Sequence, residues 1–281
     1  MKHLVIVRGG GELGTAIAIA LHRVGLRVLI LEREQPTATR RCVAFSDAMS
    51  MGEMTVERTT CYRADDPDTA RKMLKAGKIV MLADPAGKSI KRLEPNVVVD
   101  AITDEKNNGT NRDMALFTVA LGPGYCAGRD VDVVVETARG HDLGRLVYDG
   151  FCSKGGEQED ASTGYVDRDE TLAHIVFAPA SGTFEVTHAI SLMVKKDDCI
   201  GSITDATGTR TEVRAPFDGV LRGVLPHESE VVMGERIADV HPTLGQEECF
   251  TISDKARCVS GSVLEAVMAW NAEHVKKHRF F

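Results

Sequence analysis

Apolar residues in the first part of the chain alternate between short continuous runs and helical spacing. The run from Leu4 to Val7 predicts a buried strand. A helix is predicted next, because apolar residues then recur every three or four positions, at Leu13, Ala16, Ile17, Ala20, Leu21 and Val24. Gly25 is placed to end this helix, and a second strand is predicted from Arg27 to Leu31.

The same alternation continues through the first half of the chain. We expect a helix over residues 66–76 and further strands over 78–82, 96–102 and 131–135. Continuous apolar runs that alternate with helices are typical of a parallel sheet covered on both faces. The sequence therefore predicts a Rossmann-like α/β domain over residues 1–150, followed by a polar linker or surface loop over 151–174.

The second half of the chain contains an internal repeat. Ala178-Pro179-x-x-Gly182 recurs as Ala215-Pro216-x-x-Gly219, at an offset of 37 positions (216 − 179 = 37). Apolar positions match at the same offset: Val176 with Val213, Ile200 with Ile237, and Ile203 with Val240. Residues 176–203 and 213–240 are therefore predicted to be two copies of one β unit.

Two interlocked copies of this kind predict a β barrel-sandwich module, as in biotinyl and lipoyl carrier domains, over residues 175–245. In those carriers the modified lysine lies in the hairpin that joins the two halves. Here the join, residues 204–212, contains no lysine. We therefore expect the module to dock a partner or to frame the site, and not to carry a cofactor.

Residues 246–281 are expected to form a C-terminal segment with a helix. Ser262 is the predicted cap of this helix. Its predicted apolar stripe consists of Val263, Leu264, Val267 and Met268.

Composition and charge exclude several classes of protein. The formal net charge of −7 argues against a general nucleic-acid binder. No stretch approaches the roughly 18 apolar residues of a membrane span, and the first apolar run is too short for a signal peptide. We therefore expect a cytoplasmic protein without membrane association. The seven cysteines are scattered without a C-x-x-C pair, which predicts reduced thiols and no metal site.

Residues 7–14 read VRGGGELG and match the G-x-G-x-x-G spacing of a phosphate-binding turn. The helix that follows presents free N–H groups and a partial positive charge to an anion. Glu32 lies 18 positions after Gly14 (32 − 14 = 18), where an acidic residue would hold a ribose hydroxyl. The residues predicted to bind a nucleotide-type ligand are Gly9, Gly10, Gly11, Gly14 and Glu32. The alternative is that the glycines only permit tight packing and that Glu32 is a solvated strand end.

Arg8 comes immediately before this turn, although backbone amides usually suffice to bind a pyrophosphate. Two explanations are open: Arg8 supplies an additional cation to a more anionic ligand, or it forms a structural ion pair.

A second charged segment, residues 136–145, reads ETARGHDLGR. Arg139 and Arg145 are candidates to grip a carboxylate or phosphate in the same crevice, and His141 is a candidate for proton transfer. The alternative is a structural network between loops. No catalytic residue is assigned, because spacing fixes no nucleophile and base.

Several strings together resemble one known family. They are VIVRGGGELGTAIAIALHRVG, LEREQP followed by RRCVAFSDAM, SIKRLEPNVVVDAI, NGTNRDMA, LGPG, ETARGHDLGR, RAPFDGVLRG and CFTISDKAR. From residue 1 to about 267, the chain resembles the accessory proteins of selenium-dependent molybdenum hydroxylases, the YqeB type. The resemblance implies a role in maturation, in which a xanthine- or purine-type hydroxylase acquires its molybdopterin cofactor or selenium.

The resemblance also implies partners and ligands. The partners are molybdenum hydroxylase subunits or other maturation factors, and the ligand is a nucleotide or a pterin, with a molybdopterin-type cofactor and NAD(P) as the candidates. Two other functions are open. An NAD(P)-dependent oxidoreductase explains the glycine turn but not the repeat, and a non-catalytic scaffold that docks a hydroxylase subunit predicts no small-molecule binding.

Overall fold

The computed structural model describes residues 3–104, 106–152 and 175–278, which fall into two compact units. Unit 1 comprises Met1–Pro36, Ala44–Asp167 and Ser253–Phe281, and unit 2 comprises Thr37–Val43 and Arg168–Ile252. The C-terminal helix is thus part of unit 1, and Thr37–Val43 leaves the first domain to join unit 2. The sequence pattern predicts neither of these two assignments, because each depends on contacts between segments that are distant in the chain. The predicted linker falls almost wholly outside the described residues.

Unit 1 is built on a mainly parallel sheet. In the described residues this sheet has nine strands in the order β10-β9-β7-β6-β1-β2-β5-β4-β3. Every neighbouring pair is parallel except β10–β9 and β4–β3 at the two edges. The strands are β1 (Leu4–Arg8), β2 (Arg27–Glu32), β3 (Glu53–Val56), β4 (Thr59–Ala64), β5 (Ile79–Ala83), β6 (Val97–Asp100), β7 (Phe117–Leu121), β9 (Val133–Val135) and β10 (Leu146–Val147).

The strand order reverses at β1. This strand pairs with β2 on one side and with β6 on the other, and the register places Arg8 opposite both Leu31 and Asp100. In open parallel sheets, ligands bind beyond the carboxyl ends of the strands at such a switch point. Arg8, Asp100 and the glycine turn all lie there.

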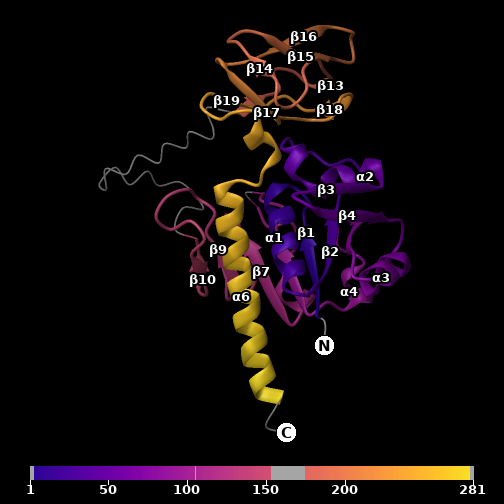
Figure 1. The fold of residues 1–281 in the computed structure, drawn as a ribbon, viewed down its shortest axis with the longest axis vertical. Coiled ribbons are helices and arrows are strands. Elements are labelled where there is room, and N and C mark those ends of the chain that lie inside the picture. The colour runs from indigo at the N-terminus through magenta and orange to yellow at the C-terminus, as the bar shows by residue number, and fades with distance from the viewer. Residues whose placement is uncertain (1–2, 105, 153–174, 279–281) are drawn as a thin grey trace. The chain divides into compact units, whose positions relative to one another are not determined.

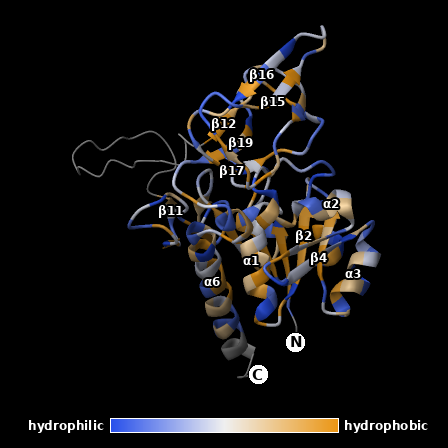
Figure 2. Cartoon of the chain, turned by 45° about the horizontal axis from the view of Figure 1, so that its top comes forward, coloured by the Kyte–Doolittle hydropathy of each residue, from blue (hydrophilic) through white to orange (hydrophobic). Residues whose placement is uncertain are grey.

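Helices cover both faces of this sheet (Figure 1). On one face, Ala70, Leu74, Ile90 and Leu93 of α3 and α4 pack in a core with Ile6 of β1. On the opposite face, α1 contacts β1 and β2, and α6 contacts α1, β7 and β9. Because successive strand residues point to opposite faces, both faces must be apolar, and Figure 2 shows hydrophobic colouring along these strands.

The helices of unit 1 are α1 (Glu12–Arg23), α2 (Ala48–Met51), α3 (Pro67–Lys75), α4 (Ile90–Leu93) and α6 (Asp254–His278), with 3₁₀ turns η2 (Phe45–Asp47) and η3 (Arg112–Met114). A small two-stranded sheet pairs β8 (Cys126–Ala127) with β11 (Gly150–Phe151). In the described part of the chain, no helix is long and apolar enough to cross a membrane.

The C-terminal helix begins earlier than predicted. It starts at Asp254, and the Ser253 hydroxyl, not that of Ser262, accepts the Ala256 backbone N–H at 3.2 Å. Its buried stripe consists of Ala256, Val259, Val263, Ala266 and Val267, whereas Met268 is exposed. The prediction was wrong because small residues at the start of this stripe concealed its period.

Unit 2 consists of antiparallel strands in two four-stranded sheets within the described residues, ordered β12-β19-β17-β14 and β16-β15-β13-β18. The strands are β12 (Ile175–Phe177), β13 (Gly182–Val186), β14 (Met193–Val194), β15 (Cys199–Thr204), β16 (Arg210–Arg214), β17 (Gly219–Val224), β18 (Ser229–Val231) and β19 (Arg236–His241). Two 3₁₀ turns, η1 (Arg41–Val43) and η4 (Glu247–Phe250), contact β17. The whole chain is thus a mixed α/β protein with a large, mainly parallel sheet and further antiparallel sheets.

The 37-position offset of the sequence repeat also relates the strands of unit 2. It carries β15 onto β19 and β13 onto the start of β17. Each sheet contains two strands from each copy of the repeat. When every strand is replaced by its counterpart in the other copy, the strand order of one sheet becomes that of the other.

The backbone details repeat at the same offset. A Cβ at Gly182 would lie 2.2 Å from the Thr204 carbonyl oxygen, and one at Gly219 would lie 2.4 Å from that of His241. The glycine of the A-P-x-x-G motif is therefore required by the same close backbone approach in both copies.

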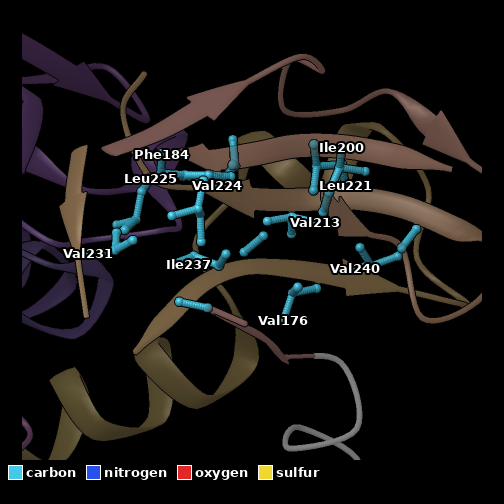
Figure 3. Close-up of a cluster of buried hydrophobic side chains, with 14 of the residues drawn as sticks. Val176, Phe184, Ile200, Val213, Leu221, Val224, Leu225, Val231, Ile237 and Val240 are labelled. Carbon is cyan, nitrogen blue, oxygen red and sulfur yellow. The ribbon is translucent and has the colours of Figure 1, made fainter. Parts of the chain in front are cut away.

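The core of unit 2 lies between its two sheets (Figure 3). Phe184, Ile200 and Val213 come from one sheet and Leu221, Ile237 and Val240 from the other, and all are buried. Ile200 and Ile237 are equivalent positions of the repeat, so the two copies supply matching halves of one core.

We expect Gly14→Ala to destabilise unit 1. The added Cβ would lie 2.0 Å from the Gly9 carbonyl oxygen, which belongs to fixed backbone. Overpacking usually costs about 1–3 kcal/mol and sometimes more, and we expect a loss of about 3 kcal/mol in the free energy of unfolding. Urea unfolding measures this through the fluorescence of Trp270, whose ring stacks on Phe117 in unit 1.

Gly261→Ala is the matched control. This glycine lies within α6, and nothing approaches its Cβ position within 4 Å. Alanine is the better helix former, so this variant should be at least as stable as the parent protein. Equal stability of Gly14→Ala and the parent would contradict the close approach.

Candidate functional site

The glycine turn joins β1 to α1 at the switch point of the unit 1 sheet. Gly9 has a φ of +99°, a left-handed conformation that favours glycine. Its N–H donates to the Leu31 carbonyl oxygen at 2.8 Å, and a Cβ here would lie 2.7 Å from the Ala101 carbonyl oxygen. Gly9 and Gly14 are thus both explained by the packing of the protein itself.

Gly11 is different, because nothing in the protein requires a glycine there. Its φ of −66° and ψ of −174° are open to any residue, and no atom of the described structure lies within 4 Å of its Cβ position. It is the N-cap of α1, yet no side chain caps the helix. Ser, Thr, Asp and Asn are the preferred N-caps. The missing side chain therefore leaves the uncapped end of α1 accessible to an anion.

Glu32 ends β2 beside the turn. Its carboxylate accepts the Gly10 backbone N–H at 2.6 Å and the Arg33 backbone N–H at 2.7 Å. The side chain is half-buried, and a Cβ at Gly10 would lie 3.3 Å from its Oε2. The structure therefore places Glu32 against the turn residues, and its contact with a ribose hydroxyl stays a prediction.

Arg8 turns away from solvent into a buried network. Its side chain is 2% exposed and its Nη1 lies 3.4 Å from Oδ2 of Asp100, which is 0% exposed. Nη1 also donates to the Thr110 hydroxyl, which in turn donates to Asp100. Nη2 donates to the carbonyl oxygens of Pro85 at 3.0 Å and Asn108 at 3.2 Å. We refer to these contacts as the Arg8 clasp.

Tyr125 completes the clasp from the segment after β7. It lies beside the Asp100 carboxylate and is 2% exposed. Burial raises the pKa of Tyr125, and the Asp100 carboxylate raises it further, so the phenol stays protonated. Thr110 and Tyr125 were not predicted from sequence. Thr110 lies in NGTNRDMA, one of the strings that carry the family resemblance, and this string is the one sequence feature that points to the residues around Asp100.

The clasp decides between the two explanations of Arg8. Of these, the geometry favours the structural ion pair, because the guanidinium is committed to Asp100, Thr110 and two carbonyl oxygens. The expected direct contact between Arg8 and a ligand phosphate stays a prediction. Contact with a ligand would require these buried bonds to break.

Arg139, His141 and Arg145 lie in the loop after β9. Arg139 pairs with Asp254 at 3.1 Å, and the neighbouring Ser253 N–H donates to Glu12 in the first turn of α1 at 2.8 Å. Arg139 is therefore linked to the glycine turn through the start of α6. Arg145 pairs instead with Asp142 at 3.6 Å, and His141 is exposed. The structure does not bring these last two side chains into contact with the turn.

The structure offers no metal centre or thiol nucleophile at this site. No group of three His, Cys, Asp or Glu residues within the described ranges is arranged to hold a metal ion. Burial raises the pKa of Cys61 and Cys249, and burial with the nearby Glu136 raises the pKa of Cys152 to about 12. Buried thiols of this kind are unreactive.

Comparison with known proteins gives one relative of clear sequence similarity. No family model matches the chain. The chain is 38% identical over 273 residues to the uncharacterized protein YqeB of Escherichia coli (strain K12), and the match covers 97% of the chain and 49% of YqeB. The chain thus spans about half the length of this relative.

Solved structures show only distant similarity. They include the E. coli tRNA N6-threonylcarbamoyladenosine dehydratase TcdA in complex with AMP, at 15% identity and a TM-score of 0.34, with coverage of 96% of this chain and 88% of that chain. They also include the product-bound ectoine utilization protein EutE (DoeB) of Ruegeria pomeroyi, at 14% identity and a TM-score of 0.23, with coverage of 85% and 57%. Similarity at this level carries no functional argument.

We expect the Arg8 clasp to behave as a coupled unit. Arg8→Met leaves the Asp100 carboxylate buried without its guanidinium, which should cost about 3–5 kcal/mol of unfolding free energy. The double variant Arg8→Met with Asp100→Asn should lose less than the sum of the single variants, because neither charge remains unpaired. Urea unfolding followed by Trp270 fluorescence gives the double-mutant cycle, and strictly additive losses would refute the coupling.

Alkylation should separate the cysteines by burial. Cys258 is exposed on α6, whereas Cys61, Cys152 and Cys249 are buried with raised pKa values. Iodoacetamide at about pH 8 should therefore modify Cys258 well before those three, as peptide mass spectrometry will show. The unfolded protein is the control, in which all seven cysteines should react. Early modification of Cys249 in the folded protein would argue for a reactive thiol there.

Proposed function

We propose that this chain belongs to the YqeB family and acts as an accessory protein in the maturation of a selenium-dependent molybdenum hydroxylase of the xanthine or purine type. In this role it binds a nucleotide or a molybdopterin-type cofactor at the glycine turn. Support for the family comes from 38% identity to YqeB along 97% of the chain. The maturation role is implied by the family resemblance of the sequence motifs.

The open position at Gly11 carries the ligand-binding part of this proposal. A Cβ at Gly11 would have no neighbouring atom within 4 Å among the described residues, and the end of α1 lacks a side-chain cap. A phosphate group fits both facts, because it needs close approach to the backbone and accepts from the free N–H groups of the first helical turn. Both a nucleotide and a molybdopterin carry such a phosphate.

The surrounding residues have separate roles in this proposal. Gly9, Gly10, Gly11 and Gly14 form the turn that receives the phosphate, and Glu32 accepts hydrogen bonds from ligand hydroxyls. Arg8 holds the turn in place from behind through the clasp. Arg139 is the candidate for additional ligand contacts, because its partner Asp254 adjoins Ser253, which bonds to Glu12 beside the turn. His141 and Arg145 are weaker candidates for the same role.

Unit 2 is proposed to be a barrel-sandwich module that docks a hydroxylase subunit or another maturation factor. The exchange of strands between the two copies supports this architecture. The hairpin tip between β15 and β16 is built on Asp205, which accepts the backbone N–H groups of Thr207 and Thr209 at 2.8 and 2.9 Å. With no lysine at this tip, a carrier role is not proposed.

The same turn is compatible with an NAD(P)-dependent oxidoreductase, which is the second candidate. It is favoured only by the G-x-G-x-x-G spacing and by Glu32, since the structure adds no acid–base pair beside the turn. A scaffold without a ligand is the third candidate, and it leaves the open position at Gly11 unexplained.

The test of this proposal combines a deletion with ligand identification. Cells that express an active molybdenum hydroxylase should lose most of its activity when this protein is deleted, because the enzyme accumulates without its complete cofactor. Gly11→Asp should fail to restore activity, since the added carboxylate caps α1 and repels a phosphate while it preserves the helix. Gly261→Ala should restore it fully. Mass spectrometry of the purified protein should find a nucleotide or a molybdopterin in the parent but not in Gly11→Asp.

Full hydroxylase activity in the deletion strain would overturn the maturation role. Reversible reduction of NAD or NADP by the purified protein with a small substrate would favour the oxidoreductase instead. Rescue by Gly11→Asp would show that the turn is not the functional site.

A further inference from the structure

We infer that the glycine turn takes a single nucleoside phosphate with a free ribose diol, such as a nucleoside diphosphate, and not a dinucleotide. This rests on the proposed ligand site and narrows the class of its ligand. The inference comes from the difference between the two sides of β1 at the carboxyl edge of the sheet.

A dinucleotide in a fold of this type lies across the switch point, with one half on each side of the central strand. Here the central strand is β1, the first side is formed by β2, and the second side is formed by β6. Both sides must therefore be open at the carboxyl edge for a dinucleotide to bind in this way.

The β2 side is open to a ligand. Gly11 has free space at its Cβ position, and Glu32 is half-buried at the end of β2. A carboxylate at this point accepts hydrogen bonds from the two hydroxyls of a ribose. Phosphates at the end of α1 and a ribose at Glu32 together describe one nucleotide.

The β6 side is filled by the protein. At the end of β6, Asp100 is 0% exposed and Ala101 is 5% exposed. Thr110 and Tyr125, which cover Asp100, are 1% and 2% exposed. Nη1 and Nη2 of Arg8 are bonded within the clasp, and Nε, which has no partner among the described residues, is buried with them. Burial therefore keeps these groups from a second nucleotide.

The clasp also fixes the loops on both sides of this edge. Arg8 bonds to Pro85 in the segment after β5 and to Asn108 in the segment after β6. The second half of a dinucleotide would have to displace these segments and leave a buried guanidinium without partners. Leaving a buried charge without its partner is strongly destabilising.

Charge at the open side excludes a second group of ligands. A 2′-phosphate on the ribose would lie against the Glu32 carboxylate, whereas Glu34 pairs with Arg63 at 2.7 Å. The negative charges of the 2′-phosphate and the Glu32 carboxylate would repel each other, whereas a free 2′-hydroxyl donates a hydrogen bond to the carboxylate. We therefore expect discrimination against 2′-phosphorylated nucleotides.

Isothermal titration calorimetry with the full chain tests these points through four probes: ADP, ADP-ribose, NAD and NADP. ADP should bind, and ADP-ribose and NAD should bind no more than threefold more tightly than ADP, because their additional groups find no site. NADP should bind at least tenfold more weakly than NAD. In Glu32→Gln the ratio between NAD and NADP should fall to below threefold, whereas Glu34→Gln, with an exposed carboxylate two positions away, should keep it.

The outcomes separate this inference from the proposed function. NAD that binds tenfold or more tightly than ADP would overturn the single-nucleotide site but leave the turn as a ligand site. Failure of all four probes to bind would also overturn the inference. The maturation role would then stand or fall on the deletion strain alone, which measures hydroxylase activity independently of nucleotide affinity.

Discussion

Unit 1 depends on a guanidinium that is buried where the strand order of its sheet reverses. Arg8 is the last residue of the central strand, so it lies at the carboxyl edge of the sheet. A buried charge without partners costs several kcal/mol. Its partners, Asp100, Thr110 and two backbone carbonyl oxygens, come from the end of β6 and from the segments after β5 and β6. These segments must converge on Arg8 for the edge to be stable, and their convergence closes one side of the site.

This convergence also marks the limit of what the sequence predicts. The β1–α1–β2 elements follow from local patterns, because hydrophobic period and glycine spacing act over a few residues. The partners of Arg8 lie 77 to 102 positions away along the chain, and no local pattern records them. The sequence therefore leaves Arg8 open between ligand contact and ion pair, and the fold shows an ion pair with Asp100. Glu32 was within reach of prediction because its distance from the turn is set by one helix and one strand.

Unit 2 shows the opposite relation between sequence and structure. Its repeat is visible at long range, since the 37-position offset holds without a gap, and the same offset relates positive φ values at Ser191 and Glu228. The hydrogen bonds exchange as well: Asp197 N–H donates to the Ala215 carbonyl and Gly234 N–H to that of Ala178, both at 2.9 Å. A duplicated unit repeats its long-range contacts along with its residues. The C-terminal helix has no repeated copy from which its start could be predicted. Its first buried positions include alanine and serine, which give no clear apolar period.

The three motif glycines show why a motif match alone is weak evidence. Gly9 and Gly14 are required by backbone packing, and a protein that binds nothing would need them equally. Gly11 alone has no use inside the described structure, so it is the position at which the structural and the ligand-binding explanations diverge. Beside it, Glu32 faces the open β2 side while the clasp closes the β6 side. In the proposed site, selectivity for a ligand would therefore depend on which side of β1 the protein fills with its own polar groups.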